Sequence, residues 1–142
     1  MYRIERRPFG FALTFGGFIR KEEMDSWCTE SREQLRGAPN SFSVLIDMRE
    51  LKPLPADAQE VMVLGQKLYK GAGMQRSAVI LNNATTTLQF IRLAKDSGID
   101  AWERYFDASS EPRWEEKSLG WVKSGIDPYE ADGREVREAM AY

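Results

Sequence analysis

Apolar and polar residues alternate in two short runs near the start of the chain. Residues 2–5 alternate Tyr and Ile with Arg and Glu, and residues 11–15 place Phe or Leu at every second position. This alternation predicts two strands, each with one buried face. The turn-forming residues 8–10 (Pro-Phe-Gly) lie between the two runs, so we expect an antiparallel hairpin whose second strand ends at Gly16 and Gly17.

Helical spacing follows in two segments. Residues 21–36 carry Met24, Trp27 and Cys28 on one side and charged residues on the other. This pattern is typical of an amphipathic helix. Residues 56–70 repeat it, and the glycines directly after that segment are a common signal for the end of a helix. We therefore expect two helices here.

Two more helices are predicted in the second half of the chain. Thr86 and Gln89 have the spacing of a capping box, so we expect a helix from about residue 86 to Gly98. A last helix is predicted over residues 112–125, because proline is tolerated in the first turn of a helix and glycine often follows its end.

Short apolar runs occupy residues 43–47 and 77–81, and a linker over residues 48–55 follows the first of them. Such short runs are typical of strands buried on both faces. Residues 101–106 are rich in aromatics and predict a further buried or edge strand. Strands that alternate with helices predict a mostly parallel sheet joined by right-handed crossovers. The expected fold class is therefore α/β, with one sheet of about five strands and an antiparallel strand at the N-terminus.

We expect one domain over residues 1–124 and a C-terminal tail over residues 125–142. The chain has 142 residues, which is near the commonest size of a single domain. Residues 134–142 have apolar side chains at helical spacing, but a helix this short is not stable alone. We therefore expect this segment either to dock on the domain or to fray.

The composition argues against most catalytic chemistry. The chain contains no histidine and one cysteine, Cys28. Without histidine it lacks the Ser-His-Asp and Cys-His arrangements and the usual ligands of catalytic zinc. Cys28 lies on the apolar side of a predicted helix with acidic neighbours, which favours a buried core thiol over a reactive one. We expect no enzymatic activity, no metal and no other cofactor.

The charge and hydropathy patterns suggest where the protein acts. The formal net charge is −2, which gives no electrostatic basis for binding nucleic acid. The first residues alternate in polarity, unlike a signal peptide, and no run of about eighteen apolar residues predicts a transmembrane segment. We therefore expect a cytoplasmic protein.

Several local strings accompany the predicted element order. They are residues 15–17 (Phe-Gly-Gly), 44–49 (Val-Leu-Ile-Asp-Met-Arg), 73–80 (Gly-Met-Gln-Arg-Ser-Ala-Val-Ile), 103–106 (Glu-Arg-Tyr-Phe) and 121–122 (Trp-Val). Together they resemble the SpoIIAA-like superfamily, which includes the STAS domains of anti-sigma-factor antagonists and the CRAL-TRIO lipid-binding domains. The resemblance covers roughly residues 1–124 and implies a bacterial regulatory or ligand-binding protein.

The resemblance does not extend to the phosphorylation switch. In the anti-sigma-factor antagonists, a phosphorylatable serine or threonine lies just after the third strand, at the start of the next helix. Residues 47–55 of this chain contain no hydroxyl residue. The resemblance therefore implies a STAS-like module without the phosphoserine switch, and a shared fold does not identify what the module binds.

Polar residues follow the predicted strands 43–47 and 77–81, at the edge of a parallel sheet where ligands usually bind. Free backbone N–H groups at the start of the next helix favour an anion, and Arg49 would help to hold it. Helix capping and a local Asp–Arg ion pair explain the same residues without a ligand, so this alternative stays open. The candidate ligand-binding residues are Asp47, Arg49, Asn82, Asn83, Thr85 and Thr86.

Two functions follow from these observations. The first is a regulatory module that docks a protein partner or a second copy of itself as a homodimer, and Phe9, Phe11 and Phe18 would give it an exposed apolar edge. The alternative is a carrier or sensor of a lipid or another small amphiphile, with a closed pocket of a few hundred cubic ångströms lined by the aromatic residues late in the chain. A carboxylate enzyme would require two acidic side chains that converge in a cleft.

Overall fold

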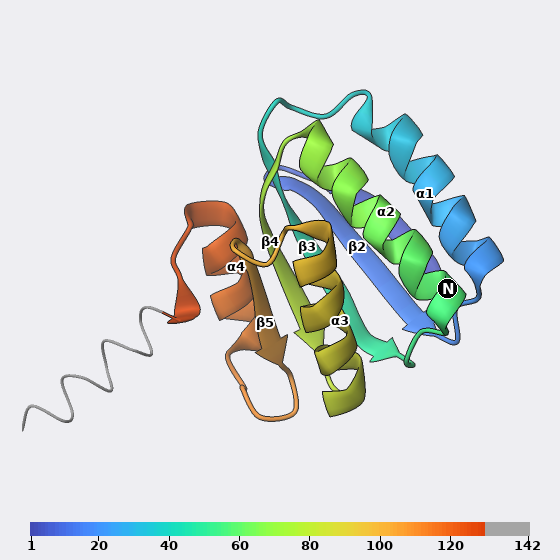
Figure 1. Ribbon diagram of the computed structural model, residues 1–142. Coiled ribbons are helices and arrows are strands. Elements are labelled where there is room, and N and C mark those ends of the chain that lie inside the picture. The colour runs from blue at the N-terminus through green and yellow to red at the C-terminus, as the bar shows by residue number, and fades with distance from the viewer. Residues whose placement is uncertain (130–142) are drawn as a thin grey trace, which may run out of the picture.

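The computed structural model describes residues 1–129. They form one five-stranded sheet with four helices (Figure 1). The elements are β1 (Tyr2–Arg7), β2 (Gly10–Gly17), α1 (Lys21–Leu35), β3 (Phe42–Leu51), α2 (Ala56–Ala72), β4 (Met74–Leu81), α3 (Ala84–Ser97), β5 (Glu103–Asp107) and α4 (Trp114–Ser124).

The strands lie in the order β1-β2-β3-β4-β5, with β1 antiparallel to β2 and the other neighbours parallel. This arrangement confirms the predicted α/β fold class. Each crossover moves the chain one strand in the same direction, so the right-handed rule puts α1, α2 and α3 on one face of the sheet (Figure 1). Since no strand follows α4 within residues 1–129, no crossover constrains that helix, and it packs on the opposite face, against β3, β4 and β5.

The main core lies between the sheet and the first three helices. At its centre the Trp27 side chain is 2% exposed. Its ring stacks on Tyr69 with centroids 5.7 Å apart and meets the ring of Phe15 edge-on at 5.2 Å. Gly65 makes this packing possible, because a Cβ at position 65 would lie 2.0 Å from the Trp27 ring. These contacts join α1 to α2 and to the sheet.

The face covered by α4 is only partly buried. Trp121 anchors α4 to it, since its indole Nε1 donates hydrogen bonds to the carbonyl oxygens of Ser77 (3.0 Å) and Trp102 (3.2 Å). Beyond α4 the same face continues over β2 and β1. The half-buried or exposed side chains on this part of the face are those of Arg3, Glu5, Arg7, Ala12 and Thr14.

β3 is longer than predicted and runs through part of the expected linker. Its register with β2 shifts, since Thr14 pairs with Asp47 while Gly16 pairs with Glu50. β3 therefore contains one extra residue, a β-bulge, between these two pairs. The bulge allows Met48, three residues before Leu51, to be buried in the same core. Sequence alternation does not reveal such an insertion.

The predicted capping box at Thr86 and Gln89 is wrong. α3 begins two residues earlier, and Asn83 is its N-cap, with its side-chain Oδ1 accepting from the backbone N–H of Thr86 at 3.0 Å. The Gln89 side chain instead holds the connection between β3 and α2. Its Oε1 accepts from the Leu54 N–H at 2.9 Å and its Nε2 donates to the Leu54 carbonyl at 3.3 Å.

Residues 126–129 fold back onto the β5 edge of the sheet. The Arg104 guanidinium binds both carboxylate oxygens of Asp127, at 2.9 and 3.0 Å. The Tyr105 backbone N–H donates to the Tyr129 hydroxyl at 3.2 Å. The first part of the predicted tail is therefore packed on the domain, and the helix predicted over residues 134–142 lies outside the described residues.

Candidate functional site

A surface groove of about 440 Å³ lies where α4 meets the uncovered part of the sheet. We call it the α4 groove. An adjoining hollow of about 420 Å³ shares Arg7, Phe9 and Leu119 with it and extends to Lys123. The α4 groove is lined by Arg7, Phe9, Leu45, Asp47, Arg49, Ile80, Trp114, Glu115 and Leu119.

The positions of these side chains follow from local structure. Alternation along β3 turns Leu45 and Asp47 away from the main core, because Val44 and Met48 point into it. Glu115 and Leu119 are four residues apart on α4, so both lie on the side of the helix that faces the groove. The apolar part of the groove thus belongs to a sheet face and a helix side that lack a further covering element among residues 1–129.

Asp47 and Arg49 form a two-pronged ion pair at the groove. The Arg49 Nε and Nη2 atoms donate to the two Asp47 carboxylate oxygens at 3.0 and 2.9 Å, and the Arg49 backbone N–H donates to Oδ1 at 3.1 Å. The guanidinium carbon also lies 4.5 Å from the centroid of the Trp114 ring. Arg49 therefore joins β3 to the first turn of α4 through a cation–π contact.

This pairing keeps Asp47 ionised. Partial burial by itself raises the pKa of Asp47, but the hydrogen bonds and positive charge of Arg49 outweigh it, so the pKa lies below its usual range. Asp47 is then a poor proton donor near neutral pH. The pair is suited to orienting a bound polar group and less suited to transferring a proton.

The other predicted site residues lie at the start of α3. The cap uses Asn83 and Thr86, and the Thr86 side chain is 1% exposed. Asn82 and Thr85 are exposed. Helix capping thus accounts for two of these four residues, and a bound anion at this helix start stays a prediction.

The structure does not bring the two groups of predicted site residues together. α3 packs on the face of the sheet that carries Met48, through Phe90 and Leu93. Arg49 instead points to the face where Trp114 and α4 lie. The predicted anion site at α3 therefore does not include the Arg49 guanidinium.

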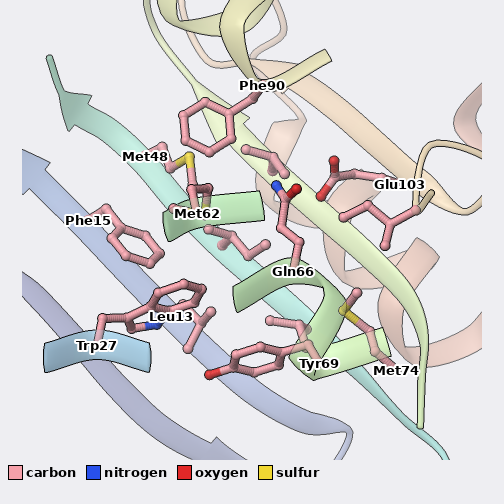
Figure 2. A pocket seen from close by; sticks show the side chains of 14 residues that line it. Leu13, Phe15, Trp27, Met48, Met62, Gln66, Tyr69, Met74, Phe90 and Glu103 are labelled. Atoms are coloured by element: carbon pink, nitrogen blue, oxygen red, sulfur yellow. The ribbon is translucent and has the colours of Figure 1, made fainter. Parts of the chain in front are cut away.

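The interior contains a small cavity of about 20 Å³ between α2 and the sheet. That volume holds about one water molecule. Figure 2 shows the Gln66 amide and the Glu103 carboxylate pointing into it from α2 and β5. Gln66 Oε1 has no hydrogen-bond partner among the described residues. The closed space is far smaller than the pocket that a lipid carrier requires.

Glu103 is a buried carboxyl group that the sequence analysis did not single out. Its side chain accepts hydrogen bonds from Ser77 Oγ at 3.0 Å and from the Tyr105 hydroxyl at 2.6 Å. Burial raises its pKa to about 7, although these two hydrogen bonds act in the opposite direction. Because neighbouring residues of a strand point to opposite faces, the sequence indicates that either Glu103 or Arg104 points inward. It does not show which of the two faces of an edge strand is buried.

The aromatic residues near the first hairpin have three different environments. Phe18 is 82% exposed, Phe9 is half-buried at the α4 groove, and Phe11 is 1% exposed. The prediction that Phe11 contributes to an exposed apolar edge is therefore wrong, because its side chain packs edge-on against Phe42 and Tyr69 in the main core.

Residues 1–129 contain neither a potential metal site nor a membrane-spanning helix. In that part of the chain, no three acidic or cysteine side chains gather as a potential metal site. None of its helices combines the length and the apolar character needed to cross a membrane.

Comparisons with known proteins return no relative. No protein-family model matches the chain, and neither a curated protein nor a solved structure matches it. The resemblance to the SpoIIAA-like superfamily therefore stays a prediction.

Proposed function

We propose that this chain is a non-enzymatic protein-interaction module of STAS-like type, without the phosphoserine switch, and that a partner protein docks on the α4 groove. The observation that carries the proposal is the apolar lining of the α4 groove by Leu45, Ile80 and Leu119, on a sheet face and helix side that no further element of residues 1–129 covers. The surface groove measures about 440 Å³, whereas the closed interior cavity measures about 20 Å³.

The chemistry of the groove suits a protein surface. Leu45, Leu119 and the Trp114 ring provide an apolar floor, and charged groups surround it. Protein interfaces typically have this arrangement of an apolar centre and a polar rim, with tryptophan frequent among the residues that contribute most binding energy. The partner would insert one or more apolar side chains beside Trp114 and pair its polar groups with Arg7 and Glu115.

The Asp47–Arg49 pair supports specificity at this surface. Because both charges are already paired and held against Trp114, docking there does not require ordering two flexible side chains. The pair presents a fixed dipole to a partner. Such a group rejects a partner whose charges are placed wrongly and selects one whose charges complement it.

The alternative function, a carrier of a small amphiphile, has no observation in its favour. It requires a closed pocket of a few hundred cubic ångströms, and the interior cavity would have to expand many times. Native mass spectrometry separates the two functions. A non-covalent adduct that is lost on denaturation would favour the carrier.

The experiment that tests the proposal uses two matched leucine variants. Leu119→Glu places a charge in the α4 groove, whereas Leu88→Glu places one on α3, where the leucine is 68% exposed. Partners would be trapped by cross-linking in cells of the source organism, then purified and titrated against each variant. We expect Leu119→Glu to weaken binding at least about tenfold and Leu88→Glu to leave it unchanged.

Two results would contradict the proposal. One is a partner that binds both variants as tightly as the unmodified chain, and the other is a partner that is lost only with Leu88→Glu. Thermal unfolding of each variant, followed by circular dichroism, shows whether a loss of binding reflects a loss of fold.

A further inference from the structure

The two edges of the sheet differ in whether another segment covers them. Along β5, residues 126–129 cover the edge, and the Tyr105 N–H is bonded to the Tyr129 hydroxyl at 3.2 Å. Along β1, no strand of residues 1–129 pairs with the outer side. β1 is a regular strand of six residues without proline or a register shift in its pairing to β2. An unpaired edge presents a row of N–H and C=O groups to another strand, and the charged side chains of β1 restrict which strand can pair with it.

The backbone groups on this outer edge can be identified from the hairpin. Met1 and Gly16 exchange both of their backbone hydrogen bonds, at 2.7 and 2.9 Å. Because bonded and non-bonded positions alternate in an antiparallel pair, the even-numbered residues of β1 direct their N–H and C=O groups outward. These residues are Tyr2, Ile4 and Arg6. In agreement, the Arg6 carbonyl accepts a hydrogen bond from the exposed guanidinium of the next residue at 3.2 Å.

We propose that β1 pairs antiparallel with β1 of a second copy of this chain, around a two-fold axis at Ile4, so that one sheet continues through both copies. Ile4 then faces Ile4 of the second copy, and Tyr2 faces its Arg6. These are the residues whose backbone groups point outward, so the pairing forms about six backbone hydrogen bonds. This inference concerns the β1 edge and does not depend on the function proposed for the α4 groove.

The charges on β1 select this register. On the open face of the sheet, Arg3 of each copy lies directly opposite Glu5 of the other, which gives two pairs of opposite charge. If the register between the two β1 strands shifts by two residues in one direction, Arg3 lies opposite Arg3 of the other copy. If it shifts by two residues in the other direction, Glu5 lies opposite Glu5. Since like charges directly opposite are destabilising, the register centred on Ile4 is preferred among those that pair the whole strand.

The helix-covered face adds a second complementary contact. Glu30 of α1 approaches the Tyr2 hydroxyl. Because Tyr2 faces Arg6 of the second copy, the same register brings that arginine toward Glu30. In each copy the Arg6 guanidinium donates to the Gln34 carbonyl (3.0 Å) and the Gly37 carbonyl (3.4 Å) of its own chain, so it faces Glu30 of the other copy as a nearby charge and not as a bonded partner. Both faces of the paired strands therefore carry opposite charges across the two-fold axis.

The size of the interface sets the expected affinity. A strand of six residues spans about 20 Å, so pairing along β1 alone gives an interface at the small end of the range for specific complexes. We expect a dimer that dissociates on dilution, with a dissociation constant in the micromolar range or weaker.

Charge reversal tests the register. Sedimentation velocity of the untagged chain over a concentration series would give the dissociation constant. We expect Arg3→Glu and Glu5→Arg each to weaken association at least about tenfold, because each turns two attractive pairs into two repulsive ones. The double variant restores opposite charges and should associate like the unmodified chain. Lys67→Glu, on the exposed side of α2, is the matched control that should change nothing.

Two outcomes would overturn the proposal. One is an unmodified chain that stays monomeric up to about millimolar concentration, and the other is a dimer that both single reversals leave intact. Amide hydrogen exchange then checks the location. The N–H groups of Tyr2, Ile4 and Arg6 should become protected as concentration rises, while those of Arg3 and Glu5, which already bond to β2, should not change. A dimer without this protection would use another surface.

Discussion

The two faces of the sheet are built from the same five strands but are covered to very different extents. Three helices cover one face, where Trp27 is 2% exposed and the remaining cavity measures about 20 Å³. One helix covers part of the other face and leaves a groove of about 440 Å³. The difference arises because each of the three crossovers must return to the sheet on the same side, whereas α4 follows the last strand of the described residues and covers the other face alone.

This difference separates stability from recognition. Burial of apolar surface stabilises the fold, so the closely packed face contributes most of the folding free energy. The partly covered face has apolar side chains that still contact solvent, so a second molecule gains free energy by covering them. We therefore expect substitutions in the core under α1, α2 and α3 to lower the unfolding free energy more than substitutions at the α4 groove.

Trp27→Ala should give the largest loss of stability. The side chain is buried and stacks on Tyr69, so its removal leaves a large cavity and costs about 3–5 kcal/mol of unfolding free energy. Urea denaturation of the variant and of the unmodified chain measures this difference. A loss below about 1 kcal/mol would contradict the description of this face as a close-packed core.

Glu103 should make the unfolding free energy of the protein depend on pH. Its pKa is about 7 in the folded chain and has its ordinary value of 4.5 when the chain is unfolded. The folded state therefore binds more protons between these values, so the stability that Glu103 contributes is fully present below about pH 4.5 and is lost as pH rises through about 7. The expected loss is about 3 kcal/mol.

Glu103→Gln checks this dependence, because the amide cannot ionise. Between pH 5 and pH 8, urea denaturation should show a falling unfolding free energy for the unmodified chain and a nearly constant one for the variant. The chain contains no histidine, so histidine does not titrate in this window. Equal stability of the unmodified chain at the two pH values would refute the prediction.

Gly65→Ala should cost about 2 kcal/mol, in spite of the higher helix propensity of alanine. The added methyl group would lie 2.0 Å from the Trp27 ring, so the buried ring or the α2 backbone would have to shift. Gly71→Ala is the matched control on the same helix, because a Cβ there has no heavy atom within 4 Å. This control should be neutral or stabilising by up to about 1 kcal/mol. Thermal or urea unfolding that shows the same effect for both variants would be inconsistent with close contact between α1 and α2.

Trp114→Ala should have the smallest effect on stability, about 1 kcal/mol or less. The side chain is half-buried at the α4 groove, and its removal mainly deletes the cation–π contact with Arg49. Comparison with Trp27→Ala by the same urea assay tests the difference between the two faces directly. If the two tryptophans cost the same, the α4 side of the sheet is as much a structural core as the other side.

The candidate site was only partly predictable from the amino-acid pattern. Asp47 and Arg49 were identified because they follow an apolar run, and they do line the groove. Arg7, Leu45 and Leu119 were not, because residues from the first hairpin, the third strand and the last helix meet there only after folding. Glu103 was missed for the same reason, since Gln66 of α2 and Phe90 of α3 meet it at the interior cavity only after folding.

The sequence by itself determined the order of strands and helices, the α/β class and the antiparallel first strand. These properties depend on local periodicity and on general rules for crossovers, and both can be read along the chain. Tertiary structure decided the bulge in β3, the cap at Asn83 and the contact of Arg49 with Trp114. Each of these depends on which distant segment a residue meets. A local pattern shows the polarity of a residue. The residue with which its side chain forms a hydrogen bond or a packing contact is determined only when the sheet and the helices pack together.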